Sequence, residues 1–390
     1  MVDSANLAPT PRIKAGLVLM SSADWLAAAS DLLIGDHVDA VEWSWDTETP
    51  HAPWALELVD YFAGRRALYA HGVMYSPFSA EFEPRQREAL AKTSAWRQLP
   101  LAVHITEHVG FMTIVGMQRG APLPAPPCRA SITAARDQLH RLADAVGRPV
   151  GLENLAMAIS GADVALQGDL IEELLVSDDA PFVLDVHNLY CQAVNFALPP
   201  LSLLHALPLH RVREIHVSGG RMHALPNGLV RRRDTHDHLV PDEVWELLAA
   251  SLPFCPRVEV VMLERLAGTL SACPGDLSAD FFRMKHVIET VVDGGANPRS
   301  TLPSSQLDGY ATSRAPLPGP SDVAELRGYQ RALVRALSAI PQASPVDAAA
   351  VRAALAAEAP GFSVYVETID DNMLAIAHAA FSRWSRERET

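Results

Sequence analysis

The chain has 390 residues, of which 49% are hydrophobic and 20% are charged, and its formal net charge is −14. This length and apolar content predict a globular protein with one large core and room for a small second domain. The acidic charge disfavours a nucleic-acid-binding protein, which usually presents a basic face, and the absence of a long apolar stretch or signal peptide predicts a cytoplasmic protein without a membrane segment.

Eight short β-branched or apolar runs follow one another along the chain and predict strands. They span residues 13–20, 40–45, 68–76, 101–108, 150–156, 182–188, 213–219 and 258–266. Segments with helical period lie between most of them, several opened by Ser or Asp and closed by Gly or Pro. Strand and helix alternating eight times predict an α/β fold, a (β/α)8 TIM barrel, whose active site would lie at the C-terminal ends of the strands.

Potential metal ligands stand at or near the ends of these runs or in the loop before the last one. The nine candidates are His71, His108, Glu153, Asp185, Asn188, His216, Asp234, His236 and Glu264. Side chains of these types are costly to bury unless they are paired or hold a cation. Each one alone has an ordinary alternative, such as a hydrogen-bonded histidine or a helix cap. Their joint placement at one end of successive strands predicts a metal site.

The number and type of donors indicate more than one ion. Nine donors exceed the needs of a single octahedral ion, and mixed imidazole and carboxylate ligands suit zinc, iron or manganese. Glu153 is a candidate bridge between two ions. Asp234 and His236 stand two residues apart, so in an extended segment both would project from the same side and chelate one ion. The four cysteines form no CxxC pair, which argues against a disulfide framework and a structural zinc site.

Several segments together resemble the multinuclear non-haem iron-dependent oxidases, the peptide-modifying family that includes the methanobactin biosynthesis enzyme. They are YAHGV, ITEHVGF, GLEN, LDVHNLY, EIHVSGG, DTHDHLVPDEVW and MLER, and the resemblance covers about residues 12–295. It implies a xylose-isomerase-like barrel with two or three irons, including an Fe(II)/Fe(III) pair. It further implies that this pair uses dioxygen to modify a cysteine, or sometimes another residue, of a ribosomally synthesised precursor peptide.

The resemblance also implies a role for each candidate ligand. The residues that correspond to the catalytic pair of irons are His71, His108, Glu153, Asp185, His216 and Glu264. Those that correspond to a third, more labile ion are Asn188, Asp234 and His236.

One position departs from the family pattern. The family strand usually reads LDVNN, whereas this chain reads LDVHN, so His187 stands where asparagine is common. On a regular strand His187 would share a face with Asp185. The alternatives are an additional ligand, a group that supports a ligand, and a substrate contact.

The main competing interpretation is a trinuclear zinc apurinic endonuclease, whose barrel has the same nine-position layout; sugar isomerases share part of it. The nuclease layout calls for a histidine where this chain has Asn188. A nuclease would also need a basic face, and the one dense basic run is 231–233. Both features favour the oxidase.

The chain beyond the barrel is expected to be a separate part. We predict a barrel domain over residues 1–295, a Pro-, Ser- and Gly-rich linker over 296–321, and a helical extension over 322–390. The extension faintly resembles the N-terminal part of the partner proteins encoded with these oxidases. It would then replace or assist a leader-binding partner protein; the alternative is a helical cap that packs on the barrel.

Overall fold

The computed structural model describes residues 12–46, 51–112, 122–225, 227–273, 275–293, 317–341 and 344–386. Eight parallel strands close into a barrel in the spatial order β1, β10, β7, β6, β5, β4, β3, β2. Their bounds are β1 (Lys14–Leu19), β2 (Ala40–Trp43), β3 (Leu68–Gly72), β4 (Ile105–His108), β5 (Gly151–Glu153), β6 (Phe182–Asp185), β7 (Val212–Ser218) and β10 (Val260–Glu264). The TIM barrel predicted from the sequence is confirmed.

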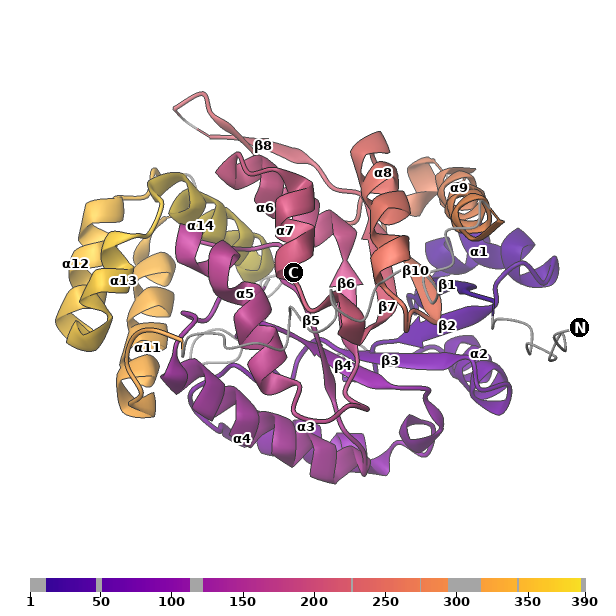
Figure 1. Ribbon diagram of the computed structural model, residues 1–390, viewed down its shortest axis with the longest axis horizontal. Helices are drawn as coiled ribbons and strands as arrows, with labels where there is room; N and C mark the ends of the chain where they lie inside the picture. The colour runs from indigo at the N-terminus through magenta and orange to yellow at the C-terminus, as the bar shows by residue number, and fades with distance from the viewer. Residues whose placement is uncertain are drawn as a thin grey trace, which may run out of the picture.

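Helices surround the barrel and continue into the C-terminal part of the chain (Figure 1). Those between or after the barrel strands are α1 (Ala23–Ile34), α2 (Pro53–Gly64), α3 (Pro84–Ala95), α4 (Arg129–Val146), α5 (Gly161–Leu174), α6 (Val186–Phe196), α7 (Pro200–Ala206), α8 (Asp242–Ser251) and α9 (Gly275–Asp293). The later ones are α11 (Val323–Ala339), α12 (Ala348–Glu358), α13 (Ser363–Glu367) and α14 (Asp371–Arg386). Within the described residues, none of the helices combines the length and apolarity needed to cross a membrane.

The barrel strands are short and almost completely buried on both faces. Every residue of β2, β3, β5, β6 and β10 is buried. This explains why their sequences are nearly continuous apolar runs rather than alternating ones, because side chains on one face fill the barrel and those on the other contact the helices. Polar side chains inside such strands therefore need partners or a ligand.

The run predicted as a strand over 182–188 ends as a strand at Asp185. The Asp185 side chain accepts a hydrogen bond from the backbone N–H of Asn188 at 2.7 Å and caps helix α6. His187 and Asn188 therefore lie in the first turn of a helix, and the expectation that His187 shares a strand face with Asp185 is wrong. The first N–H groups of a helix have no partner within the helix. The Asp185 carboxylate accepts a hydrogen bond from one of them, which favours the start of the helix over continuation of the strand.

A two-stranded hairpin that the sequence did not predict follows β7. It consists of β8 (Met222–Ala224) and β9 (Val230–Arg232) and contains part of the basic run 231–233. The loop from 233 to 239, which carries Asp234 and His236, returns from this hairpin to the barrel.

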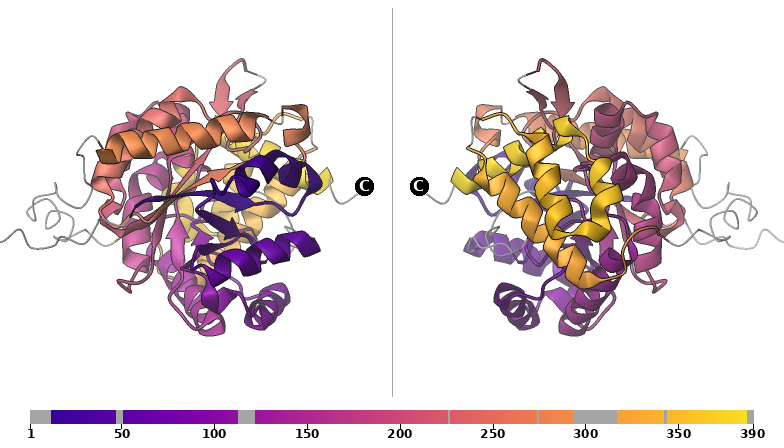
Figure 2. Two further views of the ribbon diagram at one scale, coloured as in Figure 1. Left: turned by 90° about the vertical axis from the view of Figure 1, so that its right-hand side faces the viewer. Right: turned by 90° about the vertical axis from the view of Figure 1, so that its left-hand side faces the viewer.

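The C-terminal helices pack on the barrel domain. Helix α11 contacts α4 and α14, and Gln330 of α11 accepts from the N–H of Ala80 and donates to the carbonyl of Phe78. Tyr365 donates to the carboxylate of Asp163 in α5 at 2.7 Å. Figure 2 shows these orange and yellow helices lying across one end of the barrel. Most of the predicted linker 296–321 lies outside the described residues.

Candidate metal centre

The nine candidate ligands come from six barrel strands and two adjoining segments. Six stand on strands, as His71 on β3, His108 on β4, Glu153 on β5, Asp185 on β6, His216 on β7 and Glu264 on β10. Asn188 is in the first turn of α6, and Asp234 and His236 are in the loop after β9. Strand register places His108 beside Glu153 and Asp185 beside His216.

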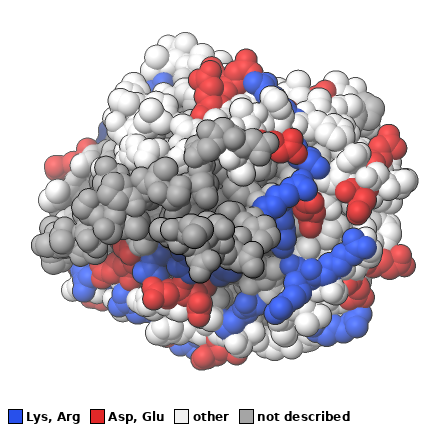
Figure 3. Space-filling view, turned by 45° about the vertical axis from the view of Figure 1, so that its right-hand side comes forward, with Lys and Arg blue, Asp and Glu red and all other residues white. Residues whose placement is uncertain are grey.

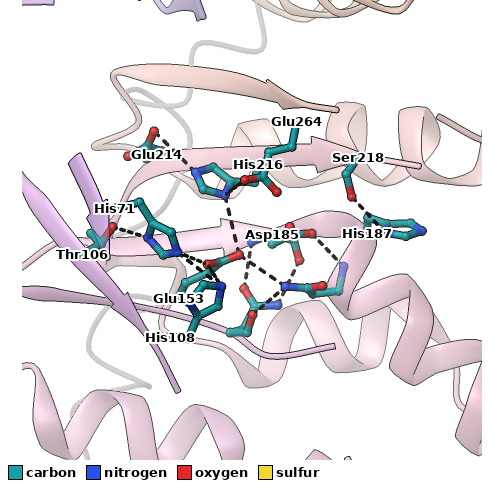
Figure 4. Close-up of polar contacts among 12 residues, drawn as sticks. His71, Thr106, His108, Glu153, Asp185, His187, Glu214, His216, Ser218 and Glu264 are labelled. Atoms are coloured by element: carbon teal, nitrogen blue, oxygen red, sulfur yellow. Dashed lines mark hydrogen bonds and ion pairs between the residues drawn. The ribbon is translucent and has the colours of Figure 1, made fainter. Parts of the chain in front are cut away.

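Glu153 lies at the centre of one group of donors (Figure 4). Its Oε2 is 2.9 Å from Nε2 of His71 and 3.3 Å from Nε2 of His108, and the two imidazole nitrogens are 3.3 Å apart. Its Oε1 is 3.3 Å from the side-chain nitrogen of Asn188 and 3.6 Å from Nδ1 of His216. The two oxygens of one carboxylate thus face two different sets of donors, as a bridging ligand requires.

Glu264 links His216 to the loop residues. Its Oε1 is 3.6 Å from Nδ1 of His216, and its Oε2 is 3.5 Å from Nε2 of His236. His236 is in turn 2.8 Å from the carboxylate of Asp234. Asp185 joins the same group, because one of its oxygens, one oxygen of Glu153 and one ring nitrogen of His216 lie within 4.8 Å of one another. All nine candidates therefore form one continuous cluster.

Two glycines allow the loop from 233 to 239 to approach the barrel. A Cβ on Gly219 would collide with the carbonyl oxygens of His238 and Leu239, and one on Gly220 would collide with that of Arg233. The same loop is held by a backbone hydrogen bond from Leu266 to the carbonyl of His236 at 2.7 Å. The GG pair after β7 is therefore a packing requirement that brings Asp234 and His236 to the cluster.

The imidazoles are oriented by partners outside the cluster. Nδ1 of His71 is 2.8 Å from the hydroxyl of Thr106, which leaves Nε2 directed at Glu153. Nε2 of His216 is 3.1 Å from Glu42, which leaves Nδ1 directed at Glu153 and Glu264. Metal-binding histidines in proteins commonly use one ring nitrogen in this way and keep the other for the ion.

Burial and neighbouring charges shift the pKa values of Glu153 and His71 in opposite directions. Burial disfavours the carboxylate of Glu153, but the nearby imidazoles of His108 and His71 outweigh it and hold its pKa well below the usual value. Burial also opposes protonation of His71, but the Glu153 carboxylate raises the pKa of His71 to about 10.

Asp185 and His108 show the opposite shifts. Burial, followed by the charges of Glu153, Asp234 and Glu264, raises the pKa of Asp185 well above its usual value. Burial lowers the pKa of His108 to about 4, so its imidazole is neutral near pH 7. Carboxylates crowded in this way and a neutral imidazole are both suited to a cation.

Unpaired buried atoms give the clearest test of whether metal ions fit. Among the described residues, Oδ2 of Asp185, Oδ1 of Asn188 and Nδ1 of His216 are inaccessible to solvent and have no hydrogen-bond partner. Buried polar atoms of native proteins nearly always have a partner. Three unpaired donor atoms from three candidate ligands within one cluster fit a metal centre.

His187 contacts the cluster from outside. Its Nδ1 is 2.8 Å from the Asp234 carboxylate and 2.9 Å from the Ser218 hydroxyl. Its Nε2 is 3.3 Å from Nε of Arg232 and 3.8 Å from the sulfur of Cys191. In Figure 4 the ring lies beyond Ser218, away from His71 and His108. Both ring nitrogens therefore face protein groups, which favours a supporting role over ligation.

Buried acids below the cluster were not among the sequence candidates. Glu42 and Glu214 are both fully buried and approach Nε2 of His216 to 3.1 and 3.5 Å, and Glu214 also pairs with His104 at 2.5 Å. Glu42, His216 and Glu264 form another group with metal-ligand spacing. A signal was present in the sequence, because Glu214 stands two residues before His216 on one strand and so shares its face.

A cavity of about 260 Å³ opens above the cluster. Seven candidate ligands line it: His71, His108, Glu153, Asn188, Asp234, His236 and Glu264. Asp185 and His216 do not line it and are fully buried. Apolar side chains from the strand ends and from α14 form much of the remaining lining. Polar side chains complete it, namely Ser44, Asn195, Arg232, Arg233 and Thr235. The donors thus form the floor of a pocket that a substrate can enter.

Comparison with known proteins gives a family match over most of the barrel. A family model described as RiPP precursor modification enzyme MbnB/TglH/ChrH matches residues 36–270. A UPF0276 protein of Caulobacter vibrioides is 33% identical over 198 residues, which cover 50% of this chain and 68% of that protein. A UPF0276 protein of Acaryochloris marina is 28% identical over 222 residues, with 53% and 77% covered.

Solved structures of other barrels are more distant. A xylose isomerase domain protein from Planctomyces limnophilus has a TM-score of 0.48 and 15% identity, covering 73% of this chain and 100% of that chain. Endonuclease IV from Thermus thermophilus has a TM-score of 0.44 and 17% identity, covering 70% of this chain and 99% of that chain. These similarities are weak, and the barrel assignment rests on the strand pairing.

Proposed function

Because the chain belongs to the family of RiPP precursor modification enzymes MbnB/TglH/ChrH, we propose that it is a cytoplasmic iron-dependent oxidase that modifies a cysteine of a precursor peptide with dioxygen. The observation that carries the proposal is the continuous cluster of imidazole and carboxylate donors at the floor of an accessible cavity. Family membership supports the peptide substrate, and the donor types support iron among the metals that such a cluster suits.

In this proposal the donors divide into two sets. The pair of irons is held by His71, His108, Glu153, Asp185, His216 and Glu264. A third iron is held by Asn188, Asp234 and His236. Bound iron would supply the electron transfer to dioxygen and would hold the substrate thiolate.

The protein's own groups prepare the site for this chemistry. Thr106 and Glu42 fix the ring orientations of His71 and His216 through hydrogen bonds. The buried floor and the apolar side chains of α14 limit the access of water, which strengthens electrostatic interactions with a bound substrate. The pKa of Glu153 lies well below its usual value, so its carboxylate is ionised near pH 7 and can bridge two cations.

The competing zinc nuclease has less support. At the position where that layout needs a histidine, Asn188 presents an amide whose oxygen has no partner among the described residues. Figure 3 brings forward the side of the molecule away from the C-terminal helices, and there basic side chains form a short band beside acidic ones. A nuclease relies on a basic surface to bind the phosphate backbone, whereas the formal net charge of this chain is −14.

The proposal is tested by removing the bridging carboxylate while keeping its shape. Co-expression with the candidate precursor peptides of the source organism, followed by mass spectrometry, should show a mass change on a cysteine-containing peptide with the wild-type protein. Glu153→Gln should abolish the change and lower the metal content. The matched control Glu246→Gln, on an exposed position of α8, should alter neither. An unchanged modification by Glu153→Gln would refute the proposed site.

A further inference from the structure

Helix α14 contributes one wall of the cavity above the metal centre. Met373, Ile376 and Ala380 line the cavity together with the candidate ligands. The three residues are separated by three and four positions, so they lie on one face of the helix. Each is 1% exposed. A helix more than one hundred residues beyond the last barrel strand therefore borders the reaction chamber.

The adjoining face of α14 has a different environment. Leu374 and Ala377 are fully buried and do not line the cavity. Helix α14 contacts α11, which itself contacts α4 of the barrel domain. The helix thus has two apolar faces, one used for packing and one presented to the cavity.

Hydrogen bonds at the start of α14 hold the helix in place over the cavity. Asp370 accepts from the N–H groups of Asn372 and Met373, each at 2.9 Å, and its own N–H donates to the carbonyl of Ile159 at 2.8 Å. The side chain of Asn227, in the turn between β8 and β9, donates to that of Asn372 at 2.8 Å. The wall is therefore attached by hydrogen bonds both to the barrel domain and to the hairpin.

The cavity has a polar floor and an apolar wall on the side of α14, and Arg232 and Arg233 also line it. Leu155, Met157 and Leu266 line it from the loops after the strands, in addition to the α14 side chains. A peptide residue that reaches the floor needs a donor atom for the cluster. A neighbouring residue that packs against α14 meets only apolar side chains of that helix, where a polar side chain would lose its hydration without gaining a partner from the helix.

We propose that the α14 face of Met373, Ile376 and Ala380 selects the substrate by packing against an apolar side chain next to the reacting cysteine. This inference rests on the function proposed above, because it assumes a peptide that enters the cavity. The C-terminal extension would then determine substrate specificity inside the cavity. This role is separate from any role in docking a leader peptide.

Short peptides of defined sequence provide the probe. Isothermal titration calorimetry would measure the binding of acetyl-Leu-Cys-Leu-amide and of the uncharged polar peptide acetyl-Ser-Cys-Ser-amide to the full-length, metal-loaded protein. Burying one leucine side chain against the wall should make the leucine peptide bind at least about 10-fold more tightly.

Two alanines of α14 make a matched pair of variants. In Ala380→Leu the added atoms enter the cavity, so binding of the leucine peptide should weaken about 10-fold while the melting temperature and metal content stay unchanged. In Ala377→Leu the added atoms enter a packed core, so the melting temperature should fall while the peptide preference is kept. Ile376→Ala enlarges the cavity and should shift the preference toward acetyl-Phe-Cys-Phe-amide.

The outcomes separate this inference from the proposed function. Normal metal content with equal binding of the leucine and serine peptides would overturn the role of α14 and leave the oxidase proposal standing. Wild-type peptide preferences in both Ala380→Leu and Ile376→Ala would also overturn it. Wild-type protein that binds neither iron nor either peptide would instead contradict the proposed function.

Discussion

Glu153 is the residue at which the two parts of the cluster meet. One of its oxygens faces His71 and His108, and the other faces Asn188 and His216. A short strand end is a suitable place for such a residue, since β5 is buried and its neighbours β4 and β6 fix its direction. The sequence predicted this position because a carboxylate at the end of an apolar run requires a partner or a cation.

Other residue-level features could not be predicted. The family resemblance left three roles open for His187, and its contact with Asp234 depends on the loop from 233 to 239 folding back onto β7. No short-range pattern encodes that approach, although the GG pair after the strand permits it. Likewise, the contact of Glu42 with His216 depends on barrel closure, which joins residues 174 positions apart.

His187 should support the third ion without binding it. His187→Ala removes the hydrogen bond that orients Asp234, so the affinity for the most weakly bound ion should fall about 10- to 100-fold, while the paired ions remain. Metal titration followed by elemental analysis would measure this. His187→Asn, which introduces the residue common in the family, should restore part of the affinity. Loss of the paired ions in either variant would show that His187 has a different role.

At the scale of elements, the sequence located all eight barrel strands but not their ends. Parallel strands buried on both faces have a distinctive apolar composition, and so their positions were clear. The end of β6 depends on a hydrogen bond that the sequence does not reveal. The Asp185 side chain accepts from the N–H of Asn188, which caps α6 and ends the strand. The hairpin β8–β9 was missed because both strands contain exposed or partly exposed residues rather than an apolar run.

Gln330 should be more important for docking the extension than the charged residue beside it. Its fully buried side chain pairs with the backbone of Phe78 and Ala80, so Gln330→Ala leaves buried groups unpaired and should reduce the free energy of unfolding by about 1–3 kcal/mol. Arg331→Ala removes an ion pair with Glu81 at a partly exposed site and should reduce it by about 0–1 kcal/mol. Denaturant unfolding compares the two variants; equal losses would argue against this contact.

The contact between α5 and α13 should make stability depend on pH. Burial raises the pKa of Asp163 from 3.8 to about 6, although Tyr365, Ile159 and Ser160 donate hydrogen bonds to it. Because the folded state binds this proton more tightly than the unfolded state, its contribution grows as the pH falls through about 6 and is lost above it.

Between pH 7 and pH 5 this group should add about 1 kcal/mol to the free energy of unfolding. Asp163→Asn cannot titrate and should lack that increment, while keeping side-chain groups that form hydrogen bonds. Unfolding curves of both proteins at the two pH values give the comparison. An identical pH response would show that Asp163 does not titrate in this range.

At the scale of the whole molecule, the barrel and the C-terminal helices share one hydrophobic core. The family model ends at residue 270, before the helices that close the cavity. The sequence could place a helical extension but not its position, because docking depends on contacts between residues up to 252 positions apart, such as Gln330 with Phe78. The division of the chain into a barrel domain, a linker and an extension at residues 295 and 321 stays a prediction, as does a role of the extension in binding a leader peptide.

The central claim is that the buried donors hold a cluster of irons. Elemental analysis and electron paramagnetic resonance of anaerobically purified full-length protein test it most directly. We predict two to three irons per chain and a mixed-valence signal, because nine clustered donors suit more than one ion. Stoichiometric zinc without iron, together with cleavage of abasic DNA, would contradict the claim.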